Sequence, residues 1–151
     1  MNFDLLGRRL ATTPACKVGR GASSRAVADA EAVLGVVFPP SLREYLTRFG
    51  WVEMADREFF GLGDGVPQFL ELVRITTSER TEAGAPLPRS LIPLLNDGGG
   101  NLYCVVATPG SSNDGMVVLW DHEQGAEQVP EVCAADLESW LESVLNDVTA
   151  E

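Results

Sequence analysis

Histidine and cysteine are scarce in this sequence of 151 residues, and long apolar runs are absent. A single histidine and three cysteines (Cys16, Cys104 and Cys133), with no C-x-x-C pair among them, predict no zinc site or other metal centre. No apolar run approaches the roughly 18 residues of a membrane span, so no membrane segment is expected. An odd number of widely spaced cysteines is typical of a reducing compartment, which predicts a cytoplasmic location.

Positive charge is also scarce, because 11 Lys and Arg residues stand against 22 Asp and Glu, for a net charge of −11. No Lys or Arg follows Arg89, whereas acidic residues continue from Asp97 to the end of the chain. A field of this sign repels phosphate backbones, so nucleic acid is not an expected partner. Two interpretations of the acidic surface remain open. It keeps the protein hydrated, or it attracts a basic protein and speeds their encounter.

The apolar content, 45% of the residues, is sufficient for one globular domain without disulfides or metal. Residues 11–23 are rich in Gly, Ser, Thr and basic side chains, which is typical of a mobile segment. The sequence therefore predicts a flexible N-terminal lead-in over residues 1–23 and a single domain over residues 24–151.

Hydrophobic spacing predicts helices separated by a group of strands. Gly35 and Gly50 follow amphipathic stripes and are expected to end two helices, while Phe69 is expected on the inner face of a third. The expected helices cover residues 25–34, 40–49, 67–80 and 137–148.

Short strands are expected between residues 51 and 62 and in three later segments, 91–95, 102–107 and 116–121. Residues 102–107 lack alternation, which indicates a central strand covered on both faces. Links of hairpin length and the turn dipeptides Asp97-Gly98 and Asp114-Gly115 favour antiparallel pairing. The predicted fold class is α+β, with a mixed, mainly antiparallel sheet flanked by helices.

No arrangement of residues predicts catalysis or a cofactor. His122 lies between Asp121 and Glu123, and in an extended segment those two acids would point away from the side of His122. The glycines of Gly98-Gly99-Gly100 lead into a strand and not into a helix, so they indicate a hairpin turn and not a phosphate loop. A small hydrolase that uses Asp97, Asp121 and His122 remains the catalytic alternative.

Short motifs follow one another in a characteristic order from about Ser24 to Val148. They are Leu34-Gly35, Phe38-Pro39-Pro40, Tyr45-Leu46, Phe49-Gly50, Phe60-Gly61-Leu62-Gly63, Leu91-Ile92-Pro93-Leu94, the segment from Asn96 to Tyr103, the segment from Gly115 to Glu123, and Leu137-Glu138-Ser139-Trp140-Leu141. Together they resemble the SUKH superfamily, the Smi/Knr-like group.

The resemblance implies an α+β domain without catalytic machinery. Bacterial members look like immunity proteins, which bind and neutralise a cognate polymorphic or contact-dependent toxin in the cytoplasm, and many of those toxins are nucleases. Fungal relatives act as regulatory or scaffold modules in cell-wall synthesis and signalling. Two departures, Phe49-Gly50-Trp51 and Val105-Val106, replace polar groups of the family pattern and imply a more apolar partner surface.

The expected partner is therefore a protein, a toxin domain with a basic surface, and the oligomeric state is not predicted. Turns and strand ends present acidic and polar side chains outward, and an aromatic side chain there can act as an anchor. The candidate partner-binding residues are Trp51, Asp97, Asn101, Asp114, Asp121, His122 and Glu123.

Overall fold

The computed structural model describes residues 2–82 and 84–150. Helices in this part of the chain are α1 (Phe3–Thr12), α2 (Ser24–Leu34), α3 (Pro40–Arg48), α4 (Leu72–Thr81) and α5 (Leu137–Ala150), with a short 3-10 helix η1 (Gln68–Leu70). The strands are β1 (Cys16–Val18), β2 (Val52–Met54), β3 (Arg57–Phe59), β4 (Leu91–Asn96), β5 (Leu102–Val106), β6 (Val117–Trp120) and β7 (Glu131–Ala134).

The strands form two antiparallel sheets, ordered β1-β2-β3 and β4-β5-β6-β7. The sheets meet just after β3, where the backbone N–H of Phe60 donates to the carbonyl of Leu94 in β4 at 2.7 Å. An isolated parallel bridge joins Gly61 to Glu71. The predicted α+β class with mainly antiparallel pairing is confirmed.

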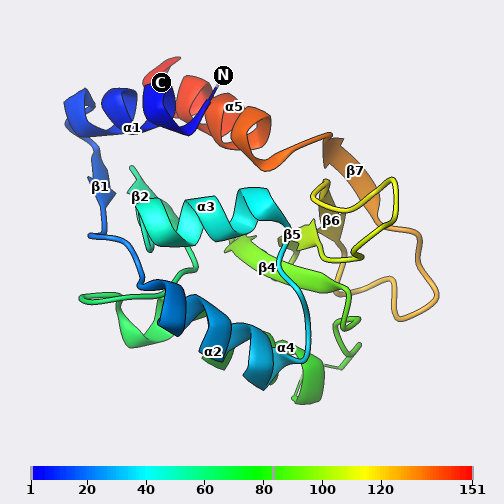
Figure 1. The fold of residues 1–151 in the computed structure, drawn as a ribbon. Coiled ribbons are helices and arrows are strands. Elements are labelled where there is room, and N and C mark those ends of the chain that lie inside the picture. The colour runs from blue at the N-terminus through cyan, green and yellow to red at the C-terminus, as the bar shows by residue number, and fades with distance from the viewer. Residues whose placement is uncertain (1, 83, 151) are drawn as a thin grey trace.

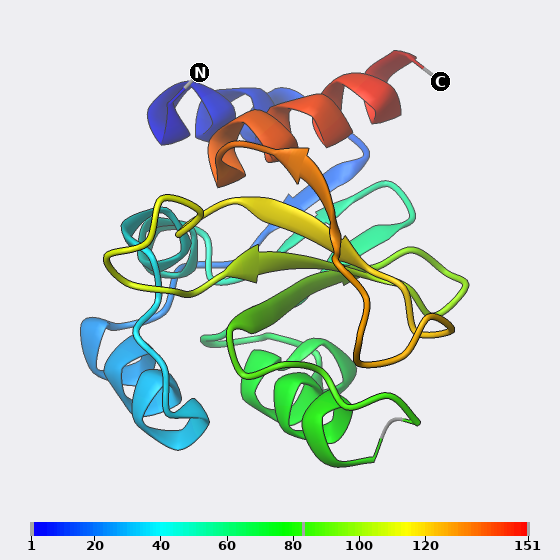
Figure 2. The same cartoon turned by 90° about the vertical axis from the view of Figure 1, so that its right-hand side faces the viewer.

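Helices cover both faces of the four-stranded sheet. Helices α1 and α5 lie together on one side, and α2 and α4 lie on the other (Figure 1 and Figure 2). Successive side chains of β5 point to opposite faces of the sheet, so this strand contributes to the packing on both. The ring of Tyr103 lies 5.4 Å from that of Trp140 in α5, whereas Cys104 points to the opposite face. Strand β5 lies between β4 and β6 and is largely buried, which confirms the central strand expected over residues 102–107.

The N-terminal segment forms a helix and a strand, which corrects the prediction of a flexible lead-in over residues 1–23, of which residue 1 lies outside the described residues. Asn2 caps α1, because its side-chain oxygen accepts the N–H of Leu5 at 2.9 Å. Residues 16–18 then pair with β2 as strand β1. The composition of residues 11–23 did not indicate this folded segment, because the apolar stripe that attaches it to the core lies earlier, in α1. The buried side chains of that stripe are Phe3, Leu6 and Leu10.

Helices α2 and α3 begin and end close to their predicted bounds. The cap of α2 is Ser23, whose hydroxyl oxygen accepts the N–H of Ala26 at 3.0 Å. Gly35 and Gly50 follow the two helices with φ angles of 66° and 76°, the left-handed conformation that ends a helix and that glycine adopts without strain.

The helix predicted over residues 67–80 is divided in two, so that prediction is partly wrong. Two backbone hydrogen bonds to Gly61 interrupt the helix. The N–H of Gly61 donates to the carbonyl of Leu70 at 2.9 Å, and the carbonyl of Gly61 accepts the N–H of Leu72 at 2.8 Å. Glu71 is extended at the break and caps α4 by accepting the N–H of Arg74 at 2.8 Å. The break turns Phe69 outward, with 61% of its surface exposed.

Strand β7 was not predicted, because a four-residue segment with exposed side chains carries no hydrophobic periodicity. Cys133 lies in β7 and is exposed. Cys104 is fully buried, and this burial raises the pKa of its thiol.

Candidate partner-binding surface

Two turns bring five of the predicted site residues together at one end of the four-stranded sheet. The turn between β4 and β5 carries Asp97 and Asn101, and the turn after β6 carries Asp121, His122 and Glu123. The two turns are neighbours because Leu102, at the start of β5, pairs with both Asn96 and Trp120. These five residues are called the sheet-end cluster.

The turn between β4 and β5 is fixed by its own side chains. Asp97 Oδ1 accepts the N–H groups of Gly99 at 2.8 Å and Asn101 at 3.1 Å. Asn96 Oδ1 accepts those of Gly98 at 2.8 Å and Gly100 at 3.3 Å. The Asp97 carboxylate is therefore held in one place while its residue stays exposed to solvent.

Asn101 links the two turns through His122. Its side-chain oxygen accepts the backbone N–H of His122 at 3.2 Å and lies 2.7 Å from Nδ1 of the imidazole. The ring lies close over Gly100, where an added Cβ atom would come within 2.9 Å of the imidazole carbon Cε1. Glycine is thus the residue that allows this contact, and the cluster is a fixed arrangement.

The segment from Asp121 to Glu123 is a turn, which corrects the expectation of an extended segment with the acids on opposite sides of His122. Asp121 Oδ1 accepts the N–H of Glu123 at 2.9 Å, and this bond folds the chain back. His122 Nε2 consequently lies 3.7 Å from a carboxylate oxygen of Glu123. Among the described residues no hydroxyl or thiol is hydrogen-bonded to His122, as a histidine-activated nucleophile would be.

Two further acids lie near the cluster, and sequence reasoning missed both. Glu79 of α4 faces His122. Partial burial raises the pKa of Glu79, and attraction between its carboxylate and His122 opposes that shift. Asp56, in the turn between β2 and β3, lines a hollow of about 340 Å³ together with Asp97. No sequence motif predicts that either acid lies near the cluster, because their positions depend on the packing of α4 and of the three-stranded sheet.

The other two candidates lie elsewhere. Asp114 belongs to the loop between β5 and β6, at the opposite end of these strands, and its carboxylate accepts the N–H of Thr108 at 2.8 Å. Trp51 precedes β2, is half-buried, and donates its indole N–H to the carbonyl of Asp64 at 3.4 Å. The structure therefore does not join Asp114 or Trp51 to the sheet-end cluster.

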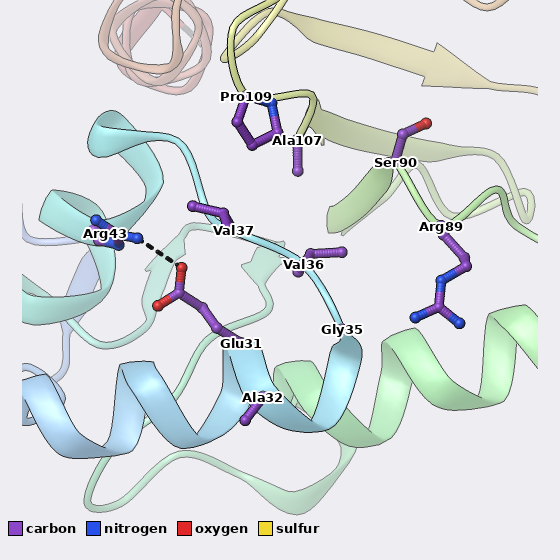
Figure 3. Close-up of a pocket in the computed structure, with 10 residues that line it drawn as sticks. All are labelled: Glu31, Ala32, Gly35, Val36, Val37, Arg43, Arg89, Ser90, Ala107 and Pro109. Atoms are coloured by element: carbon purple, nitrogen blue, oxygen red, sulfur yellow. Dashed lines mark hydrogen bonds and ion pairs between the residues drawn. The ribbon is translucent and has the colours of Figure 1, made fainter.

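A larger hollow, of about 650 Å³, lies between α2, the start of α3 and the loop after β5 (Figure 3). Its charged groups already have partners. Glu31 accepts from Arg43 Nη2 at 2.9 Å and from the N–H of Phe38 at 2.7 Å, and Arg89 donates to the carbonyl of Leu34 at 3.4 Å. These hydrogen bonds stabilise the link between α2 and α3, so the charged groups of the hollow have a structural role.

No helix in the part of the chain that the structure describes has the length and apolar character needed to cross a membrane. Within residues 2–82 and 84–150, no three His, Cys, Asp or Glu side chains are grouped so that they could hold a metal ion. The chemistry that the sheet-end cluster offers is negative charge and hydrogen bonding at an exposed surface.

The fold and this surface define a class, an α+β domain that presents its polar groups on exposed turns. A family model described as SMI1-KNR4 cell-wall, SUKH_5, matches residues 9–146, and the chain belongs to this SUKH family. The match includes β1 and the end of α1. A protein from Pseudomonas syringae pv. tomato, known from a crystal structure, has a similar fold, with a TM-score of 0.59 and 22% identity over 83% of this chain and 84% of that one. No curated protein matches the chain significantly.

Proposed function

We propose that this chain is a non-catalytic, cytoplasmic protein-binding domain that acts as an immunity protein and neutralises a toxin with a basic active site. The observation that supports the proposal is the sheet-end cluster, in which hydrogen bonds hold the carboxylates of Asp97 and Asp121, and the backbone of Glu123, at one end of the sheet. Membership of the SUKH family is consistent with such a binding role.

Fixed carboxylates suit this role for a physical reason. An enzyme that cuts nucleic acid holds phosphates in a cationic groove, and acidic side chains are natural substitutes for those phosphates. The charge distribution favours such a partner, because the net charge is −11 and no Lys or Arg follows Arg89 in the sequence, although Arg57 lines the hollow beside Asp97. Long-range attraction of this kind raises the rate of association more than it raises affinity.

A regulatory module in cell-wall processes is the second candidate, and the description of the matching family favours it. Both candidates bind a protein, so they differ in the identity of the partner. An adjacent gene for a large toxin favours immunity, whereas its absence favours regulation.

The test measures association between this chain and the toxin domain encoded beside its gene, across a series of salt concentrations. The variants are Asp97→Asn and Asp121→Asn, because asparagine keeps the side-chain oxygen that holds each turn and removes the charge. We expect the association rate of the wild type to fall as salt rises. At low salt each variant should associate about two- to fivefold more slowly, as expected for one exposed ion pair.

The matched control is Asp29→Asn, because Asp29 is an exposed acid on α2 outside the cluster. It should behave as the wild type does. Rates that do not change with salt or with the cluster variants would show that the acidic surface only hydrates the protein. Failure of the chain to protect cells that produce the toxin would overturn the immunity role itself.

A further inference from the structure

Strand β7 forms an open edge of the four-stranded sheet. The sheet order ends at β7, which pairs with β6 on one side. Among the described residues, no backbone hydrogen bond joins β7 to any other element. Glu131, Val132 and Cys133 are exposed, with 59% of the surface of Val132 open to solvent. The edge therefore offers unpaired backbone groups and an uncovered apolar side chain.

An apolar groove of about 310 Å³ lies over one face of the four-stranded sheet and reaches this edge at Val132. Its outer wall is the loop between β6 and β7, where Gln128 accepts the N–H of Asp121 at 3.0 Å and donates to the carbonyl of Asp121 at 2.6 Å. This clamp fixes the loop, although 92% of the surface of Val129 is exposed on it. The groove is thus already formed, and its apolar lining includes Val106, Val118, Trp120, Val129, Pro130 and Val132.

Negative charge predominates on the segment that forms the groove and the edge, although Arg57 lines a hollow together with Glu131, Val132 and Cys133. Residues 121–136 contain five acidic residues and no Lys or Arg. Two of them, Glu127 and Glu131, are exposed on the loop and on β7. A segment that carries apolar side chains alternating with basic ones would match both the groove and its charged rim.

We propose that the β7 edge binds a basic, extended segment of the partner protein as an additional β-strand. Main-chain hydrogen bonds along β7 supply affinity, and the groove selects apolar side chains at alternate positions. Lys or Arg side chains of the segment lie near Glu127 and Glu131. The inference rests on the proposed function in that the partner is a protein, and it adds where and how that protein binds.

The charge pattern distinguishes this partner from a second copy of the chain. Charges and bulges commonly protect sheet edges from self-association, and β7 carries a register shift opposite Val117 and Val118. Two copies of the acidic segment 121–136 repel each other, whereas a basic strand is attracted to it. The same acids that discourage pairing of two identical edges therefore favour the proposed occupant.

The first test uses the full chain and a synthetic peptide of about six residues, an ordinary strand length, in which valine alternates with lysine or arginine. We expect the peptide to shift the NMR signals of the β7 amides and to slow their hydrogen exchange. A peptide in which glutamate replaces every basic residue should not bind. No change at β7 with about 1 mM of the basic peptide, a concentration that detects weak binding, would overturn the proposal.

Backbone pairing is tested with two N-methylated peptides, methylated at odd or at even positions. Only alternate residues of an added strand direct their N–H groups toward the sheet, so one peptide should lose binding and the other should keep it. Equal binding by both peptides would show that side chains alone are recognised, and strand addition would be excluded.

Protein variants test the groove and its rim. Val132→Thr keeps the shape and the strand preference but introduces a hydroxyl, and it should weaken peptide binding about tenfold. Its control is Val33→Thr on α2, a valine with 68% of its surface exposed outside the groove. Glu131→Gln should weaken binding at low salt and lose this effect at high salt, whereas Asp29→Asn should have no effect.

The outcomes separate this proposal from the proposed function. If the toxin binds and neither Val132→Thr nor Glu131→Gln changes its affinity, strand addition at β7 is wrong and the immunity role stands. If the peptide adds to β7 and no toxin is bound or neutralised, the immunity role is wrong and the edge site stands. Dimers that form through β7 in sedimentation experiments, and that the peptide does not disrupt, would identify a second copy as the occupant and overturn the proposal.

Discussion

At the scale of single residues, the absence of a side chain at Gly100 allows the ring of His122 to pack against the turn between β4 and β5. The imidazole occupies the space beside Gly100 that a Cβ atom would need, and from there it reaches Asn101. The φ angle of Gly100 is also positive, at +101°, which side chains disfavour. A glycine in a turn thus serves both the backbone and the packing of a histidine from another turn.

The first prediction compares Gly100→Ala with Gly98→Ala. Both positions have φ near +100° (+101° and +96°), so each alanine should lower the free energy of unfolding by about 1–3 kcal/mol. An added Cβ meets nothing within 4 Å at Gly98 but overlaps His122 at Gly100. Gly100→Ala should therefore be the more destabilising and should displace the His122 ring in NMR spectra. Urea unfolding measures the difference, and equal losses would contradict the packing described for His122.

At the scale of elements, the N-terminal cap of α5 determines where this helix begins and which of its side chains are buried. Asp136 Oδ1 accepts the N–H of Ser139 at 2.8 Å, and this bond lowers the pKa of the Asp136 carboxyl. The helix that begins there places Trp140 against Phe59, with ring centroids 5.6 Å apart. The cap thus fixes the start of a helix that closes one side of the core.

The second prediction concerns this cap. Asp136→Ala should lower the free energy of unfolding by about 0.5–2 kcal/mol at neutral pH. Because the pKa of Asp136 is lowered in the folded state, its contribution is present above the pKa of the unfolded chain and is lost as the pH falls through the folded pKa. The difference between wild type and variant should therefore shrink in acid. Asp136→Asn, which keeps an oxygen acceptor, should cost less, and a difference that does not depend on pH would contradict the role of the charge.

The elements that the sequence predicts well are those with local signals. Gly35 and Gly50 end helices where the spacing of apolar residues also ends, and Asp97-Gly98 marks a turn by its residue types. The break before α4 had no such signal, because it depends on hydrogen bonds to Gly61 from another part of the chain. The residues of the sheet-end cluster were predictable as turn residues, but the attraction between Glu79 and His122 depends on tertiary packing.

At the scale of the whole molecule, α1 is part of the core. The ring of Phe3 lies 6.0 Å from that of Phe49, and Asp4 pairs with Arg48 at the end of α3. Arg9 donates to the side-chain oxygen of Asn146 in α5 at 2.9 Å. The first helix of the chain is therefore joined to a central helix and to the last one.

The third prediction tests this docking of α1. Leu6 is fully buried, so Leu6→Ala should lower the free energy of unfolding by about 2–5 kcal/mol. Leu5→Ala, one residue away on the same helix, is the control, because 45% of the Leu5 surface is exposed and the loss should be small. Chemical unfolding of both variants measures the contrast. Similar small losses would mean that residues 1–23 behave as the lead-in that their composition indicates.

The contact between α1 and α5 also constrains when the fold can be completed. Arg9 and Asn146 are 137 residues apart, so the layer that they share closes one of the longest loops the chain allows. During synthesis α1 emerges from the ribosome before α5. Part of the apolar stripe of α1 therefore stays uncovered until α5 has also emerged. Final closure of this layer is a late event in folding, because contacts that are distant in sequence form slowly.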